Sequence, residues 1–144
     1  MKRKLNIIFS LLLNSILIFC FLIACEKQKG TATAIVEQTT ETMLVIKINE
    51  AEENTTLLSV METLRTKKKL SFETVSGMVN SINGKANTAD YSSCWMLYTS
   101  DSEMANTEWG TIEYNGNTYG SAILGAETLT VIANAYYIWI YQSF

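Results

Sequence analysis

The sequence predicts an α+β domain in which one amphipathic helix packs on one face of a mixed β-sheet, preceded by a secretory signal. Three observations support this fold class. Apolar residues recur at helical spacing in one segment, several other segments alternate between apolar and polar residues, and an uncharged apolar run precedes them all. One helix followed by a series of strands forms the layered arrangement typical of α+β domains.

The first 24 residues have the three parts of a secretory signal. Residues 2–4 are all basic, residues 5–24 carry no charge, and a small alanine precedes Cys25. The tetrapeptide "LIAC" at residues 22–25 looks like a bacterial lipobox, whose cysteine receives a diacylglyceryl group and becomes the first mature residue. We therefore expect a signal peptide over 1–24, lipidation at Cys25, and a lipid anchor on the extracellular face of the cell membrane.

An uncleaved transmembrane anchor is the alternative interpretation, because about 20 apolar residues can span a bilayer. The apolar run ends at a cysteine preceded by a small residue, and only Glu26 and two spaced lysines follow directly. The absence of a basic cluster at this point favours the lipoprotein. In both interpretations the basic start stays in the cytoplasm and the remaining chain lies outside it.

Residues 26–41, "EKQKGTATAIVEQTTE", are rich in threonine and charge and poor in large apolar side chains. This composition predicts that residues 25–41 form the lipidated cysteine and a flexible tether. Residues 42–144 then form one domain, a length that suits a single hydrophobic core.

The charge of the expected mature chain excludes one class of partner. Three of the 11 basic residues lie before Cys25, so 8 remain against 14 acidic residues and the net charge is −6. Nucleic-acid binding needs basic stripes, so we expect no nucleic-acid partner.

The residues that most enzymes use are missing from the sequence. The chain has no histidine, which removes the commonest general base and the Ser–His and Cys–His nucleophile pairs. Cys94 is the only cysteine after Cys25, so the domain has no internal disulfide, and beside Trp95 we expect its thiol to be buried and inert. We predict that the protein is not an enzyme and that it has no catalytic residues, metal ligands or cofactor.

The elements follow from the hydrophobic pattern. Residues 42–50, "TMLVIKINE", alternate as a strand, and residues 54–69 form an amphipathic helix capped by Asn54 or Thr55. Its apolar positions are Leu57, Val60, Met61 and Leu64. Further strands are expected at 70–76, 78–82 and 94–99, with a hairpin at 111–121 and two closing strands within 129–142. The expected turns are Asn83-Gly84, Asn115-Gly116 and, in the last hairpin, Ala133-Asn134-Ala135.

All three tryptophans and all seven tyrosines lie after residue 90. For Trp95 and Trp139 we expect cross-strand packing within the sheet. Trp109 lies in a polar connection beside Gly110, where it either stacks on a ligand or folds back over the core. The candidate ligand-binding residues are the aromatic side chains that we expect to be exposed, namely Trp109, Tyr98, Tyr114 and Tyr119.

Several of these segments together resemble a known family. "TLL" at 56–58 in the helix, "SINGKAN" at 81–87, "WMLY" at 95–98 and "WGTIEYNGNTYGSAI" at 109–123, followed by a tyrosine-rich last strand, are similar to the transcobalamin-like C-terminal domain family. This family occurs in surface proteins of low-GC Gram-positive bacteria, and the resemblance covers about residues 42–144. The chain departs from it at residues 133–135, where many members have an Asp-Gly turn.

The resemblance implies a β-grasp-like sheet with the helix across it, and a domain that forms one half of a clamp around cobalamin. We therefore expect a membrane-anchored extracellular lipoprotein that binds cobalamin or another corrinoid, with a second protein or a dimer completing the site. The alternative is a surface protein-interaction or adhesion module that recognises a protein or a glycan and has no small-molecule ligand.

Overall fold

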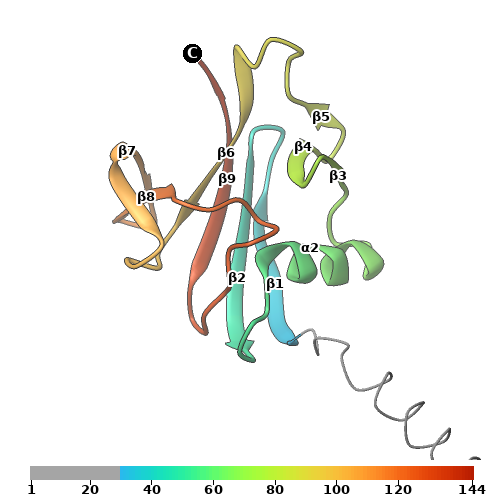
Figure 1. Cartoon of the computed structure of the whole chain (residues 1–144), viewed down its shortest axis with the longest axis vertical. Coiled ribbons are helices and arrows are strands. Elements are labelled where there is room, and N and C mark those ends of the chain that lie inside the picture. Colours follow the sequence, from blue (N-terminus) through green and yellow to red (C-terminus); the bar gives the residue numbers. More distant parts are fainter. Residues whose placement is uncertain (1–29) are drawn as a thin grey trace, which may run out of the picture.

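The computed structural model describes residues 30–144 (Figure 1). The signal peptide expected over residues 1–24 and the lipidation expected at Cys25 lie outside these residues and stay predictions. Within the described part, no helix has the length and apolar character needed to cross a membrane.

A six-stranded sheet in the order β1-β2-β9-β6-β8-β7 forms the body of the fold, and a three-stranded sheet, β3-β4-β5, lies beside it (Figure 1). These strands and one helix confirm the α+β class. The elements are β1 (Ala32–Thr39), β2 (Met43–Ala51), α2 (Leu57–Thr66), β3 (Phe72–Val75), β4 (Met78–Ile82), β5 (Lys85–Ala86), β6 (Ser93–Thr99), β7 (Ala105–Tyr114), β8 (Asn117–Ala122) and β9 (Tyr136–Ser143).

Every neighbouring pair of strands in the described sheets is antiparallel, so the expected mixed sheet is wrong. β2 and β6 do run in the same direction, as two strands joined through a helix usually do. They are not neighbours, because β9 lies between them and is antiparallel to both.

The flexible tether expected over residues 25–41 is wrong for residues 32–39. Residues 32–39 form β1, which pairs with β2 from Ala32↔Ala51 to Thr39↔Leu44. Ala32, Ala34 and Val36 pack against the main hydrophobic core, and the threonines that suggested a linker favour a half-exposed edge strand equally well. The folded part therefore begins before residue 42.

Helix α2 covers one face of the large sheet (Figure 1). Its four buried residues are the ones that the spacing predicts, Leu57, Val60, Met61 and Leu64. The cap is Thr56 rather than Asn54 or Thr55, because the Thr56 hydroxyl accepts the N–H of Ser59 at 3.3 Å. The hydroxyl of Thr55 instead donates to the carbonyl of Glu52 at 2.8 Å.

The last hairpin differs from the expected one. Only its second strand forms, as β9, and residues 129–135 run as a connection with a single bridge between Thr56 and Thr130. The start of α2 uses the backbone of this connection, since Leu57 N–H donates to the carbonyl of Leu129 and Val131 N–H donates to that of Thr55, both at 2.8 Å. The expected turn at Ala133-Asn134-Ala135 does form, with positive φ at Asn134, although it joins a connection to β9 rather than two strands. The turns at Asn83-Gly84 and Asn115-Gly116 are confirmed too, with positive φ at all four residues.

The two faces of the large sheet carry separate hydrophobic clusters. Tyr137, Trp139 and Tyr141 on β9 belong to the main core under α2, and Ile138 and Ile140 belong to the cluster on the opposite face, as the alternation predicts. The hairpin β7–β8 supplies the aromatic side chains that cover this opposite face. The helix and the small sheet therefore pack on one face of the large sheet, and the side chains of the β7–β8 hairpin pack on the other.

Candidate functional site

The three candidate tyrosines lie together, on the face of the sheet away from α2. Tyr98 and Tyr119 are 3% and 7% exposed, so the expectation that they are exposed is wrong. The ring centroids of Tyr114 and Tyr119 are 6.5 Å apart, and the Tyr98 hydroxyl donates to Gln142 Oε1 at 2.9 Å. Burial raises the pKa of Tyr119 and of Tyr114. These rings form a packed cluster under the hairpin, a role that the sequence pattern does not distinguish from ligand stacking.

Trp109 lies apart from this cluster. It belongs to strand β7 rather than to a loop, and 63% of its surface is exposed, so it does not fold back over the core. The pairing of β7 with β8 shifts between Asn106 and Thr111, and Gly110 has a φ of 129°. This irregular backbone carries Trp109 on the edge strand of the sheet, where stacking on a partner remains open to it.

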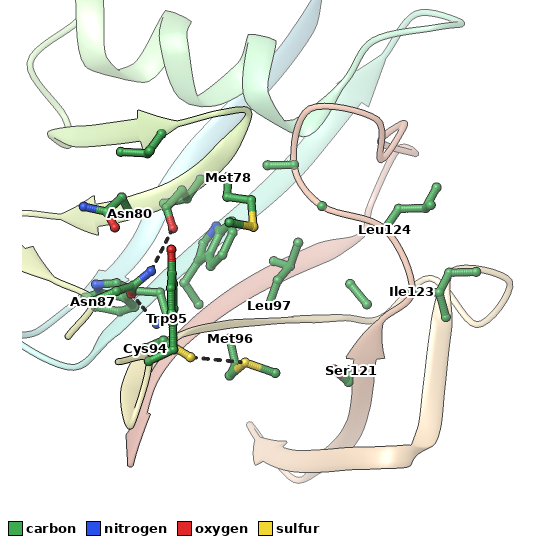
Figure 2. Close-up of a pocket in the computed structure, with 17 residues that line it drawn as sticks. Met78, Asn80, Asn87, Cys94, Trp95, Met96, Leu97, Ser121, Ile123 and Leu124 are labelled. Atoms are coloured by element: carbon green, nitrogen blue, oxygen red, sulfur yellow. Dashed lines mark hydrogen bonds between the residues drawn. The ribbon is translucent and has the colours of Figure 1, made fainter. Parts of the chain in front are cut away.

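An apolar cleft of about 330 Å³ lies elsewhere, between the small sheet, the first half of β6 and the connection after β8 (Figure 2). In Figure 2, Met78 approaches the cleft from β4, Ile123 and Leu124 lie on the side of the connection, and Met96 lies on β6. No Asp, Glu, Lys or Arg is among the described residues that line it. These are Val75, Met78, Val79, Asn80, Asn87, Tyr91, Cys94, Trp95, Met96, Leu97, Ser121, Ala122, Ile123, Leu124, Gly125, Ala126 and Trp139.

The cleft opens where β6 lacks a strand on one side. β8 pairs with β6 only at Tyr98 and Thr99, so within residues 30–144 the part of β6 before them has β9 as its only strand neighbour. On the open side, the backbone N–H of Trp95 donates to Asn87 Oδ1 at 2.8 Å. A side-chain amide thus satisfies one group on the β6 edge, and the space that a further strand would fill becomes the cleft.

Large apolar side chains at this cleft are unusually exposed. Met78 is 57% exposed, Val75 is 52% exposed, and Ile123 and Leu124 are each 40% exposed. Single exposed apolar residues are ordinary, but a group of them around a hollow is typical of a ligand or partner site. The sequence pattern did not reveal this group of exposed apolar residues. A signal that could have revealed it is the apolar pair Ile123-Leu124 directly after the β7–β8 hairpin, where a polar connection is expected.

Both cleft tryptophans are almost completely buried, and they confirm the expected cross-strand packing. Trp95 contacts Tyr141 on β9 edge to face, with ring centroids 5.4 Å apart, and its Nε1–H donates to the carbonyl of Lys85 at 2.8 Å. Trp139 lies opposite Leu97 on the neighbouring strand. Unlike Trp95 Nε1, Trp139 Nε1 has no hydrogen-bond partner.

Two titrating groups lie at or near the cleft, the thiol of Cys94 in its lining and the carboxylate of Asp90 beside its rim. Cys94 is partly exposed rather than buried, and desolvation raises the pKa of its thiol, so the thiol stays protonated near neutral pH. Its Sγ lies 3.8 Å from Met96 Sδ. Asp90 is next to the rim residue Tyr91, and hydrogen bonds from Ser92 lower its pKa to about 2. The lining is therefore neutral and soft, which suits an apolar ligand.

A second, more polar depression of about 640 Å³ lies beside β8 and the start of β9. Tyr119 and Tyr136 contribute aromatic surface there, with ring centroids 6.1 Å apart. The polar residues Ser100, Asn117 and Thr118 also line this depression.

Comparison of the chain with protein-family models, curated proteins and solved structures finds no match. Within residues 30–144, no group of three or more His, Cys, Asp or Glu side chains is placed to hold a metal ion.

Proposed function

We propose that the protein is a membrane-anchored extracellular lipoprotein that binds an apolar ligand in the cleft beside β6. One observation carries this proposal: Val75, Met78, Ile123 and Leu124 are 40–57% exposed around a single neutral hollow. Exposing this much apolar surface costs free energy unless another molecule covers it. The volume of about 330 Å³ is at the lower end of the range for small-molecule sites.

The anchor in this proposal is the lipid on Cys25, at the extracellular face of the cell membrane. The basic start, the uncharged run and the lipobox-like "LIAC" support it. The proposed anchor at Cys25 and the edge strand β1, which begins at Ala32, are only a few residues apart along the chain. This short spacing would hold the sheet close to the lipid surface.

Cobalamin or another corrinoid is the ligand that the transcobalamin-like resemblance implies. The β-grasp-like arrangement is part of the same proposal, and a helix across one face of a sheet supports it. A broad corrin disc would enter a cleft of about 330 Å³ only by one edge. A second protein or a second copy would then have to cover the rest of the ligand, since affinity depends on enclosure.

Calorimetric titration of the full chain in lipid nanodiscs tests the proposal, with cobalamin, cobinamide and the apolar probe 2-ethylnaphthalene as ligands and empty nanodiscs as the reference. We expect saturable binding of at least the apolar probe. Leu124→Glu should weaken it about tenfold or more, because it places an unpaired charge in the apolar lining. Ile35→Glu is the matched control, since Ile35 is 46% exposed and is not a lining residue. Absence of binding, or equal loss in both variants, would contradict the proposal.

The alternative function is a surface interaction or adhesion module, and the polar depression at Tyr119 and Tyr136 favours a glycan as its partner. The partly exposed Tyr136 ring and the polar residues Ser100, Asn117 and Thr118 in the same depression match the apolar faces and hydroxyls of a sugar. A glycan array probed with the full chain and with Tyr136→Ala tests this function. Specific glycan binding that Tyr136→Ala removes would support it, and an empty array would remove the glycan as a partner.

A further inference from the structure

Trp139 carries a hydrogen-bond donor that the fold leaves unused. The side chain is only 5% exposed, and its Nε1 is the one buried side-chain nitrogen or oxygen in residues 30–144 that has no hydrogen-bond partner. Buried indole N–H groups are normally paired, because an unpaired donor has lost its water without gaining an acceptor. An exception inside a candidate binding site therefore points to a missing partner.

The other two tryptophans show that the fold can satisfy this group. Trp95, which lines the same cleft, donates its Nε1–H to the carbonyl of Lys85 at 2.8 Å. Trp109 is 63% exposed, so its indole N–H can reach water. Trp139 alone has neither a protein acceptor nor solvent, although it stands opposite the cleft residue Leu97 in the sheet.

The surroundings indicate the charge of the missing acceptor. The described lining of the cleft contains no basic residue, so a carboxylate or phosphate would be desolvated there without a counter-ion. A neutral carbonyl-type oxygen accepts a hydrogen bond at a much smaller desolvation cost. Asn87, one of the polar residues of the lining, already uses its Oδ1 for Trp95 N–H and its Nδ2 for the carbonyl of Val79.

We infer that the part of the ligand that enters this cleft is uncharged and mainly apolar, and that it presents a carbonyl-type acceptor that pairs with Trp139 Nε1–H. The inference rests on the proposed function, because it assigns the ligand class of the same site. Since Nε1 is covered in the structure, lining side chains must shift to admit the acceptor. Met78 makes this shift inexpensive, because methionine is unbranched and flexible and this side chain is 57% exposed.

A matched pair of probes tests the inference, 2-acetylnaphthalene and 2-ethylnaphthalene, which share the ring system and differ in the carbonyl. The full chain, labelled with ¹⁵N in its tryptophan indoles, is titrated in lipid nanodiscs, and each probe is corrected for partition into empty nanodiscs. We expect the ketone to bind about tenfold more tightly. We also expect it to move the indole proton resonance of Trp139 downfield, while the resonance of Trp109 stays in place.

Trp139→Phe identifies that resonance and should abolish the preference for the ketone, whereas Trp109→Phe should retain it. Equal binding of both probes, or a preference without a shift of the Trp139 indole, would overturn the inference and leave the apolar cleft as a binding site. Failure of both probes to bind would overturn the proposed function together with the inference. The indole shift in the natural sequence decides the matter even if Trp139→Phe does not fold.

Discussion

Asn87 joins the two sheets through Trp95: its Oδ1 accepts the backbone N–H of Trp95 at 2.8 Å, and its Nδ2 donates to the carbonyl of Val79 at 3.3 Å. One side chain thus connects β6 of the large sheet to β4 of the small sheet. This connection holds the small sheet at the distance from β6 at which the cleft opens.

Asn87→Ala should lower the free energy of unfolding by about 1–3 kcal/mol, because it leaves a partly buried backbone donor and acceptor without partners. Urea denaturation measures this loss. Asn117→Ala is the control, since Asn117 is exposed and its Nδ2 donates to the carbonyl of Asn115 in the same turn, and it should change stability by about 0.5 kcal/mol or less. Equal effects of the two substitutions would contradict the role assigned to Asn87.

Gly116 in the β7–β8 turn should be required for its backbone conformation and not for lack of space around a side chain. Gly116 has a φ of +74°, and a Cβ added there would meet no atom within 4 Å. Gly116→Ala should therefore cost about 1 kcal/mol through backbone strain only. Gly125 also has free space but lacks a positive φ, so Gly125→Ala should be close to neutral. Thermal unfolding compares the two variants, and a neutral Gly116→Ala would count against the turn geometry.

The carboxylate of Asp90 should titrate far below an ordinary aspartate. The hydroxyl and backbone N–H of Ser92 donate to it, and its pKa is lowered from 3.8 to about 2. Its contribution to the loop is present above the ordinary pKa and is lost as the pH falls through about 2. Carbon NMR of the carboxyl group follows this titration. Ser92→Ala should return the midpoint toward 3.8, and a natural-sequence midpoint already near 3.8 would refute the assignment.

Cys94 should react slowly with alkylating reagents. Desolvation raises the pKa of its thiol, so less thiolate is present at a given pH, and thiolate is the reactive form. Mass spectrometry of the Cys94 peptide after iodoacetamide treatment at pH 8 should show slower alkylation in the folded protein than in urea. Filling the cleft with an apolar probe should slow it further, because Cys94 lines that cleft. Equal rates in the folded and unfolded protein would contradict this picture.

The aromatic candidates should separate into two groups on substitution. Tyr119→Ala should destabilise the protein by about 3–5 kcal/mol, as removal of a buried aromatic ring does. Trp109→Ala should change the free energy of unfolding by about 0.5 kcal/mol or less, because its side chain is 63% exposed. Guanidinium denaturation measures both, and a large loss for Trp109→Ala would mean that its ring packs on the domain.

Local patterns predicted the parts of the fold that depend on neighbouring residues. The apolar face of α2 from Leu57 to Leu64, the Asn115-Gly116 turn and the two faces of β9 all follow from spacing or turn chemistry. β1 was missed because Ala32, Ala34 and Val36 are too small to distinguish an edge strand from a linker, and only pairing with β2 orders them.

The candidate site depended on contacts between distant segments, which a single sequence does not reveal. Tyr98 and Tyr119 resemble exposed aromatic residues in sequence, but the hairpin folds over the sheet and buries them. The cleft brings Met78, Met96 and Leu124 together from three separate segments. Its existence follows from the short pairing of β8 with β6, a property of strand register rather than of composition.

The central claim is that the cleft beside β6 binds an apolar ligand, and the methionine methyl groups offer the most direct test of it. In the full chain labelled with ¹³C at its methionine methyls, intermolecular NOEs are recorded from bound 2-ethylnaphthalene. We predict NOEs to Met78, which lines the cleft and is 57% exposed, and none to Met61, which is fully buried on the inner face of α2. NOEs that reach Met43 on the opposite face instead, or none to Met78 at saturating probe, would contradict the account.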